Sequence, residues 1–316
     1  MSKPSSTGTG KYEDLLAKCR ELSPAATAVA YPCEESALTA VREAAGAGLI
    51  EPILVGPADS IKTLADRLEI DLAPYTLVDV PDSHEAAAKA VELVRNAQAE
   101  ILMKGSLHSD ELLGAVVARE SGLRSGRRLS HVFLMDVPTY HKGLIITDAA
   151  INIAPDLEAK ADIVQNAIDL AIALGVAQPK VAILSAVETV TTKIPSTLDA
   201  AALCKMADRG QIRGGLLDGP LAFDNAISKE AAKTKGIASP VAGDADILLA
   251  PDLEAGNMLA KQLSFLANAD SAGLVLGARV PVVLTSRADS VRARLASAAV
   301  ALRLAHARRA STGAPA

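Results

Sequence analysis

The sequence predicts an α/β protein of two domains, built from parallel or mixed sheets flanked by helices. Short apolar runs alternate with stretches of helical periodicity, which is the pattern of βαβ units. The runs are continuously apolar, which indicates that both faces of each sheet are covered. The chain has 316 residues, and at roughly 100 to 200 residues per domain this length favours two domains.

Four buried strands are expected in the first third of the chain, each followed by an amphipathic helix. Because strands that alternate with helices pair in parallel, these segments should form one sheet with crossover connections. The expected strands are residues 27–31, 52–55, 76–80 and 101–103, and the expected helices are 34–47, 59–69, 83–98 and 109–121.

The rest of the chain continues this alternation. A helix over 157–175 is ended by Gly175 and Pro179, since glycine and proline are common at helix ends. After it we expect strands at 181–185, 212–217, 246–250, 272–276 and 280–284, and helices at 196–210, 257–267 and 290–308.

A polar stretch that contains arginine and glycine, residues 122–128, separates the two sets of units. We therefore expect a flexible tail over residues 1–11, a discontinuous α/β domain I made of residues 12–129 and 288–316, and an α/β domain II over residues 130–287. The discontinuity assumes that the terminal helix returns to pack on the first domain.

The composition excludes several classes of protein. Half of the residues are hydrophobic, the net charge is −5 and only 2% are aromatic, so the chain is neither disordered nor suited to nucleic acid. No apolar run approaches the roughly 18 residues of a membrane span, and the first dozen residues lack a signal-peptide core. We expect a cytoplasmic protein that binds no membrane. The three cysteines show no CxxC spacing, which supports neither a disulfide framework nor a zinc site.

Polar clusters at predicted strand ends are the candidate site, because ligands of open parallel sheets bind outside the carboxyl ends of the strands. A basic group before the last helix could grip a phosphate or carboxylate, although the same residues could simply cap that helix. The clusters are Lys104 with Gly105, Ser130 with His131, Thr147 and Asp148 with Asn152, Asp218 and Gly219 with Asp224, and Ser286, Arg287 and Asp289.

The sequence contains neither GxGxxG nor GxxxxGK[ST], which argues against a classical dinucleotide site and a P-loop. Asp148, Asp218 and Asp224 could ligate a metal, but no histidine or cysteine supports them and their spacing is not that of a cage. We therefore expect no bound metal and no permanent cofactor.

Five motifs in order resemble the phosphate acetyl/butyryltransferase family. They cover nearly the whole chain and are strongest between Ser130 and Ser290. The motifs begin at Thr147 (TDAAINI), Leu184 (LSAVE), Asp218 (DGPLAFD), Pro251 (PDLEAGNM) and Leu284 (LTSRADS).

The resemblance implies an isocitrate/isopropylmalate dehydrogenase-like architecture with the active site in the interdomain cleft. The implied reaction converts acyl-CoA and phosphate to acyl phosphate and CoA, with acetyl or butyryl as the acyl group. The CoA thiolate would attack the acyl carbon directly in a ternary complex. CoA would then be a substrate, and the protein would be a homodimer without metal.

Matching the motifs position by position assigns roles to individual residues. Ser286 would lie near the thiol or carbonyl, Arg287 would hold phosphate, and Asp289 is the nearest carboxylate for the base, because Ala293 stands where the acetyltransferase branch has its carboxylate. The substrate-binding residues would be Lys104, Gly105, Ser130, His131, Thr147, Asp148, Asn152, Asp218, Gly219 and Asn257.

Two other functions keep the same fold. A metal- and NAD-dependent dehydrogenase would need a divalent metal and nicotinamide. A non-catalytic CoA-binding protein would bind CoA without phosphate-dependent acyl exchange.

Overall fold

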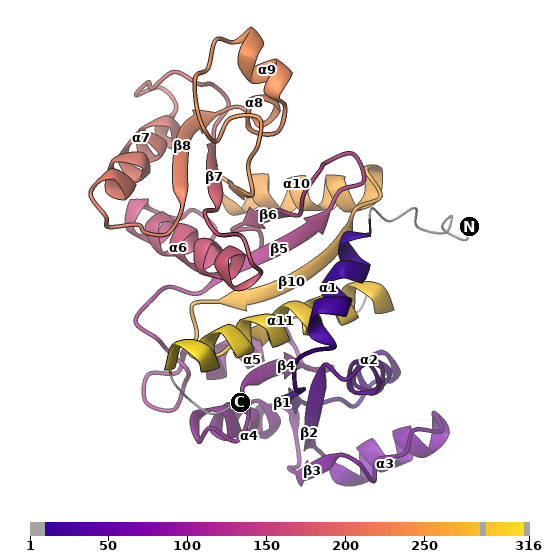
Figure 1. Ribbon diagram of the computed structural model, residues 1–316. Coiled ribbons are helices and arrows are strands. Elements are labelled where there is room, and N and C mark those ends of the chain that lie inside the picture. The colour runs from indigo at the N-terminus through magenta and orange to yellow at the C-terminus, as the bar shows by residue number, and fades with distance from the viewer. Residues whose placement is uncertain (1–9, 285–288, 313–316) are drawn as a thin grey trace. The chain divides into compact units, whose positions relative to one another are not determined.

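The computed structural model describes residues 10–284 and 289–312, and the chain divides into two compact units (Figure 1). The central unit is formed by Arg128–Ser271 together with the described residues up to Tyr12. The flanking unit is formed by Glu13–Arg127 and the chain from Ala272 onward. Helix α1 (Lys11–Cys19) contains the first boundary.

The flanking unit has strands in the order β3-β2-β1-β4-β11-β10. All neighbours pair in parallel except β11 and β10, which are antiparallel. The strands are β1 (Ala25–Ala30), β2 (Ile50–Gly56), β3 (Thr76–Asp79), β4 (Ile101–Lys104), β10 (Asp270–Leu276) and β11 (Val282–Val283).

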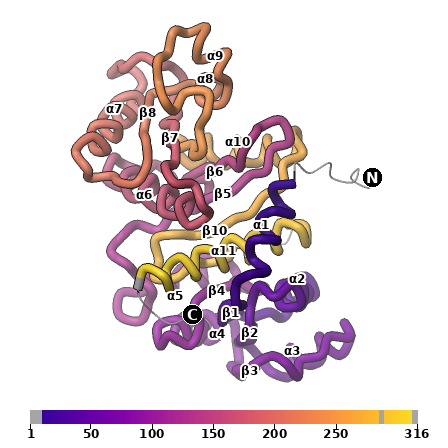
Figure 2. The backbone as a smooth tube through the Cα atoms, in the orientation of Figure 1, coloured from indigo at the N-terminus to yellow at the C-terminus, as the bar shows by residue number. Residues whose placement is uncertain are grey.

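The helices of this unit cover its sheet and include the last helix of the chain. Figure 2 shows α11 in yellow beside the indigo α2, and α11 also packs against β4 and β11. Arg309 near the end of α11 pairs with Glu100, which directly precedes β4. The helices are α2 (Glu35–Gly46), α3 (Ala58–Arg67), α4 (Ser83–Arg95), α5 (Ser109–Val117) and α11 (Val291–Thr312).

The central unit has strands in the order β5-β6-β9-β7-β8. The pair β5 and β6 is antiparallel, and the other neighbours are parallel. The start of β5 therefore lies at the same edge as the carboxyl ends of the other strands. The strands are β5 (Ser130–Asp136), β6 (Leu144–Thr147), β7 (Lys180–Leu184), β8 (Leu216–Leu221) and β9 (Ile247–Leu249).

Helices flank this sheet as well, with α6 and α10 packed against β5 and β6 and with α7 against β8. Asp156 and Asp252 cap α6 and α10 by accepting hydrogen bonds from Ala159 N (2.8 Å) and Ala255 N (2.9 Å), which satisfies backbone donors in the first turn. The helices are α6 (Leu157–Ala173), α7 (Pro195–Asp208), α8 (Phe223–Ile227), α9 (Lys229–Thr234) and α10 (Leu253–Leu266).

The predicted fold class is confirmed, since mixed sheets flanked by helices form both units. Three predicted bounds were wrong. The helix expected over 109–121 is α5, which ends at Val117. The strand expected at 212–217 is β8, which runs from Leu216 to Leu221. The helix expected from residue 257 begins at Leu253, because Asp252 caps it and Gly256 is accommodated in its first turn.

The predicted domain boundaries stay a prediction, with changes after residues 129 and 287. The compact units change after residues 127 and 271. Residues 272–284 accordingly belong with the flanking unit, because Val282 and Val283 pair with Leu102 and Met103 of β4.

Candidate active site

The carboxyl edge of the central sheet brings together most of the predicted site residues of that unit. Thr147 is the last residue of β6, and it pairs with Leu249 of β9 and with Val132 of β5. Ser130 and His131 begin β5, so the antiparallel pairing places them beside the Thr147–Asp148 segment. The sequence indicated the cluster after Thr147 but not this neighbour relation.

Asp148 is the centre of this edge and is only 2% exposed. Its Oδ1 accepts hydrogen bonds from Ala150 N (2.9 Å) and Ile151 N (3.0 Å). Its Oδ2 accepts from Asn152 N (3.3 Å) and Asn152 Nδ2 (2.6 Å). Both carboxylate oxygens are therefore used to shape the loop after β6, which is a positioning role.

Two further hydrogen bonds tie this loop to the start of β5. Asn152 Nδ2 also donates to the Leu129 carbonyl at 2.8 Å, and Thr147 Oγ1 donates to the His131 carbonyl at 2.9 Å. Thr147 is fully buried. The side chains of Thr147 and Asn152 thus hold backbone in place.

His131 is 4% exposed, and its ring makes an edge contact with Phe133 at a centroid distance of 4.4 Å. Burial lowers the pKa of His131 well below its ordinary value of 6.5, and the nearby Asp148 carboxylate only partly opposes this shift. The imidazole is consequently neutral at pH 7. Its buried Nδ1 has no hydrogen-bond partner.

Ser130 is completely buried, and its hydroxyl accepts a hydrogen bond from Asn166 Nδ2 at 3.0 Å. The same amide donates to the Arg128 carbonyl at 3.0 Å. Sequence reasoning missed Asn166. The available signal was a polar residue on a face of α6 that is otherwise buried and apolar, with Ile163 and Ala167 beside it.

Helix α10 contacts the loop after β6 through two residues of its first turns. Asn257 Nδ2 donates to the Ala149 carbonyl at 3.0 Å. A Cβ at Gly256 would lie 2.3 Å from the Asp148 carbonyl oxygen, so only glycine permits this approach. Asn257 therefore lies in the same hydrogen-bonded arrangement as Asp148 and Asn152.

The expectation that Asp218 and Gly219 follow a strand was wrong, because both lie inside β8 and Asp218 is paired with Ala182 of β7. Asp218 Oδ1 accepts a hydrogen bond from Gly219 N at 2.9 Å. A Cβ at Gly219 would lie 2.8 Å from Ile183 Cβ, which gives this glycine a packing reason.

In the flanking unit, Lys104 ends β4 and its ammonium group donates to the carbonyls of Gly105 (3.3 Å) and Leu107 (3.1 Å). Gly105 approaches β1 closely, since a Cβ at this position would lie 2.4 Å from the Ala30 carbonyl oxygen.

Of the three predicted catalytic residues, Asp289 lies within the described part of the chain. Ser286 and Arg287 lie outside the residues that the structure describes. Asp289 is half-buried and lies two residues before α11.

Metal and thiol chemistry find little support in residues 10–284 and 289–312. No group of three or more His, Cys, Asp and Glu side chains gathers there in a way that could hold a metal ion. Burial raises the pKa of Cys19 and Cys33 to about 11 and that of Cys204 to about 12, so these thiols stay protonated at neutral pH.

None of the described helices is long and apolar enough to span a membrane.

The described residues form an α/β protein whose polar residues gather at the carboxyl ends of the strands of the central sheet, and this fold is shared with known acyltransferases. A solved structure described as a branched-chain phosphotransacylase from Enterococcus faecalis V583 is 32% identical with a TM-score of 0.79, over 89% of this chain and 99% of that one. The sequence profile described as "Phosphate acetyl/butaryl transferase" matches residues 82–302. The chain belongs to this family and is an acyltransferase.

Two curated relatives differ in the acyl group that their names give. A phosphate acetyltransferase of Rhizobium meliloti is 65% identical over 95% of this chain and 95% of its own length. A phosphate butyryltransferase of Clostridium acetobutylicum is 42% identical over 92% of this chain and 96% of its own length. These relatives support the acyltransferase prediction and not the dehydrogenase alternative.

Proposed function

We propose that this protein is a phosphate acetyltransferase, which exchanges an acetyl group between CoA and inorganic phosphate. The observation that carries the proposal is the 65% identity to a phosphate acetyltransferase over nearly the full length of both chains. Butyryltransferases at 42% identity make butyryl the alternative acyl group. The protein acts in the cytoplasm on acyl-CoA, phosphate and acyl phosphate.

The reaction proceeds by direct transfer. A base removes the proton of the CoA thiol, and the thiolate attacks the carbonyl carbon of acetyl phosphate. The new C–S bond forms as the bond between the carbonyl carbon and the bridging oxygen breaks, and that oxygen leaves with the electron pair as part of inorganic phosphate. The protein must supply a base for a thiol of pKa near 8.5, cations for the phosphate and donors for the oxyanion.

The residues before α11 are assigned to these tasks. Arg287 holds phosphate through a bidentate contact, Ser286 donates a hydrogen bond near the carbonyl, and Asp289 accepts the thiol proton. Asp148 is not the base, since its oxygens already accept four hydrogen bonds from the loop that it shapes. Its role is to keep residues 148–152 in one conformation for substrate.

The remaining substrate-binding assignments are Lys104, Gly105, Ser130, His131, Thr147, Asn152, Asp218, Gly219 and Asn257. The side chains of Ser130, Thr147 and Asn152 form hydrogen bonds with backbone carbonyls or with another side chain. These contacts favour a role in positioning the site over a direct role in the reaction. The neutral imidazole of His131 adds no charge at pH 7.

A homodimer is proposed from the exposed face of α10. Met258, Phe265 and Leu266 are 57%, 78% and 82% exposed, and their spacing places them on one side of the helix. Ile153, 76% exposed, lies next to the start of α10, where its carbonyl accepts from Leu253 N at 3.1 Å. Exposed apolar side chains on one side of a helix fit a second copy of the chain. Sedimentation of a Phe265→Glu variant tests it, and an unchanged dimer would reject this face.

The acyl group and the metal requirement are tested in one assay. CoA release is measured with acetyl-, propionyl- and butyryl-CoA at saturating phosphate, with and without EDTA. The proposal expects the highest kcat/KM with acetyl-CoA and no effect of EDTA. A preference for butyryl-CoA would reassign the acyl group, and loss of activity that Mg²⁺ restores would overturn the metal-free mechanism.

A further inference from the structure

The central unit contains a polar cavity at the edge of its sheet opposite to Asp148. The cavity has a volume of about 420 Å³, which is within the range of small-molecule sites. We call it the lysine pocket and define it by Lys180, Lys229, Lys233, Ser239 and Asp244, which line it. Lys180 is the first residue of β7, whereas the Asp148 edge lies at the carboxyl ends of the strands.

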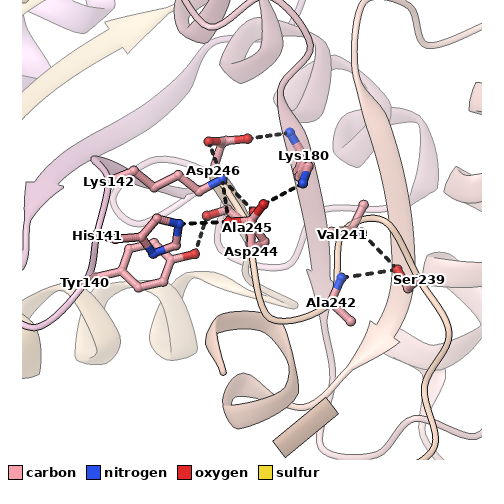
Figure 3. Close-up of polar contacts among 10 residues, drawn as sticks. All are labelled: Tyr140, His141, Lys142, Lys180, Ser239, Val241, Ala242, Asp244, Ala245 and Asp246. Carbon is pink, nitrogen blue, oxygen red and sulfur yellow. Dashed lines mark hydrogen bonds and ion pairs between the residues drawn. The ribbon is translucent and has the colours of Figure 1, made fainter. Parts of the chain in front are cut away.

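The single carboxylate that lines this pocket is already neutralised (Figure 3). Asp244 accepts hydrogen bonds from Lys180 Nζ (2.5 Å) and contacts His141 Nε2 (2.8 Å), and Lys142 Nζ lies 3.2 Å from it. Burial of Asp244 by itself raises its pKa, but the hydrogen bonds from Lys180, His141 and Lys142 outweigh this and hold the pKa below its ordinary value. Asp244 is therefore charged and committed to its neighbours.

The two other lysines carry charge without such a partner. Within the described residues, no carboxylate forms an ion pair with Lys229 or Lys233, although both side chains line the cavity. They are four residues apart in α9, so both ammonium groups extend from one side of the helix. The pocket thus has positive charge in a protein of net charge −5.

The backbone that carries these groups is held in place. A Cβ at Gly243 would lie 2.5 Å from the Lys229 Cα, and Gly243 N donates to the Asn225 carbonyl at 2.7 Å. Ser239 Oγ accepts from Val241 N (3.0 Å) and Ala242 N (3.1 Å), as Figure 3 shows. The Ser239 hydroxyl proton remains available to donate to a ligand.

The cavity also has an apolar part. Ala232 is buried, and Ile237 and Ala242 are half-buried beside the lysines. A ligand that fits must therefore have at least two negative charges and a short hydrocarbon or compact body. Lysine ammonium groups bind phosphate as well as carboxylate.

We propose that the lysine pocket binds a small polyanionic metabolite, carrying carboxylates or phosphates, at a site separate from that of acyl transfer. Lys229 and Lys233 contact its negative groups and Ser239 donates a hydrogen bond, while Lys180 stays paired with Asp244 at the wall of the pocket.

The test is isothermal titration of the full chain with citrate and, separately, with pyrophosphate. The double variant Lys229→Gln/Lys233→Gln should weaken binding about tenfold or more, since two charge-assisted contacts are lost. Lys229→Arg/Lys233→Arg keeps the charge and should keep binding. Lys62→Gln, an exposed lysine of α3, is the matched control.

Binding of citrate alone would identify a carboxylate ligand, and binding of pyrophosphate alone would identify a phosphate ligand. Equal affinity of the wild type and the double variant would overturn the proposal, as would the absence of binding by either probe up to millimolar concentration. Basal acyl transfer by the double variant should equal that of the wild type, which separates this result from a failure of the proposed function.

Discussion

The two edges of the central sheet use polar residues in opposite ways. At the carboxyl edge, Asp148 is buried, and its carboxylate accepts four hydrogen bonds from the loop that follows β6. At the other edge, Lys229 and Lys233 line an open cavity without ion-pair partners among the described residues. Polar groups that are bonded within the protein fix the shape of a loop, whereas exposed charges in a fixed cavity are able to bind a ligand.

The largest expected effect follows from excluding Asp148 as the base. If Asp289 accepts the thiol proton, Asp289→Asn should lower kcat by about 10² to 10⁴, the usual contribution of a general base. Melting temperature and KM for CoA should stay near the wild-type values. Steady-state kinetics and a thermal melt of the variant test whether Asp289 is the base. A near-normal kcat would remove Asp289 from the catalytic residues; the cap of α11 is Ser290, whose Oγ accepts a hydrogen bond from Ala293 N at 3.2 Å.

The positioning role of Asp148 predicts a loss of stability. Asp148→Ala removes one acceptor for four hydrogen bonds and leaves buried donors unpaired, so the free energy of unfolding should fall by about 3 kcal/mol. Urea denaturation measures it. The control is Asp224→Ala, since Asp224 is exposed, and it should change stability by less than about 0.5 kcal/mol. Equal behaviour of the two variants would contradict the assigned role.

Arg287, outside the described residues, is expected to act on binding rather than on fold. Arg287→Ala should raise the KM for phosphate by about 10-fold to 150-fold, which corresponds to roughly 1.5 to 3 kcal/mol for a charge-assisted contact. The KM for acyl-CoA should change far less. Initial-rate measurements with each substrate varied in turn test this, and unchanged constants for both would remove Arg287 from the site.

The smallest effect concerns pH. Because the folded-state pKa of His131 is lowered below 6.5, the unfolded state takes up a proton first, and stability is lost as the pH falls through the unfolded value. Between pH 6.5 and about 5.5 this group should cost about 1 kcal/mol. His131→Gln should flatten the fall in melting temperature over that range. His84→Gln, in a side chain 82% exposed, should leave the fall unchanged, and an unaltered slope in both variants would contradict the assignment.

Much of the fold was predictable because its signals are local. Buried strands such as 101–103 and helices such as 157–175 are visible in the hydrophobic pattern, and β4 and α6 confirm them. The antiparallel partner β5 was not predicted, since its position depends on a pairing between Val132 and Thr147 that no local pattern shows. That pairing is what brings His131 beside Asp148.

The candidate site was predictable only in part for the same reason. Residues of the Thr147–Asn152 motif are close in sequence, and the motif marked them. The lysine pocket joins Lys180 to Asp244, 64 residues later in the chain, and to two lysines of α9. No spacing rule connects these positions, so only the folded structure could reveal the pocket.

Phosphate-dependent release of CoA from acetyl-CoA by the purified protein tests most directly whether it is a phosphate acetyltransferase. We expect that release requires phosphate, yields acetyl phosphate in equal amount and is faster with acetyl-CoA than with butyryl-CoA. Release of CoA that is independent of phosphate, or no release with any of the acyl-CoA substrates, would contradict it.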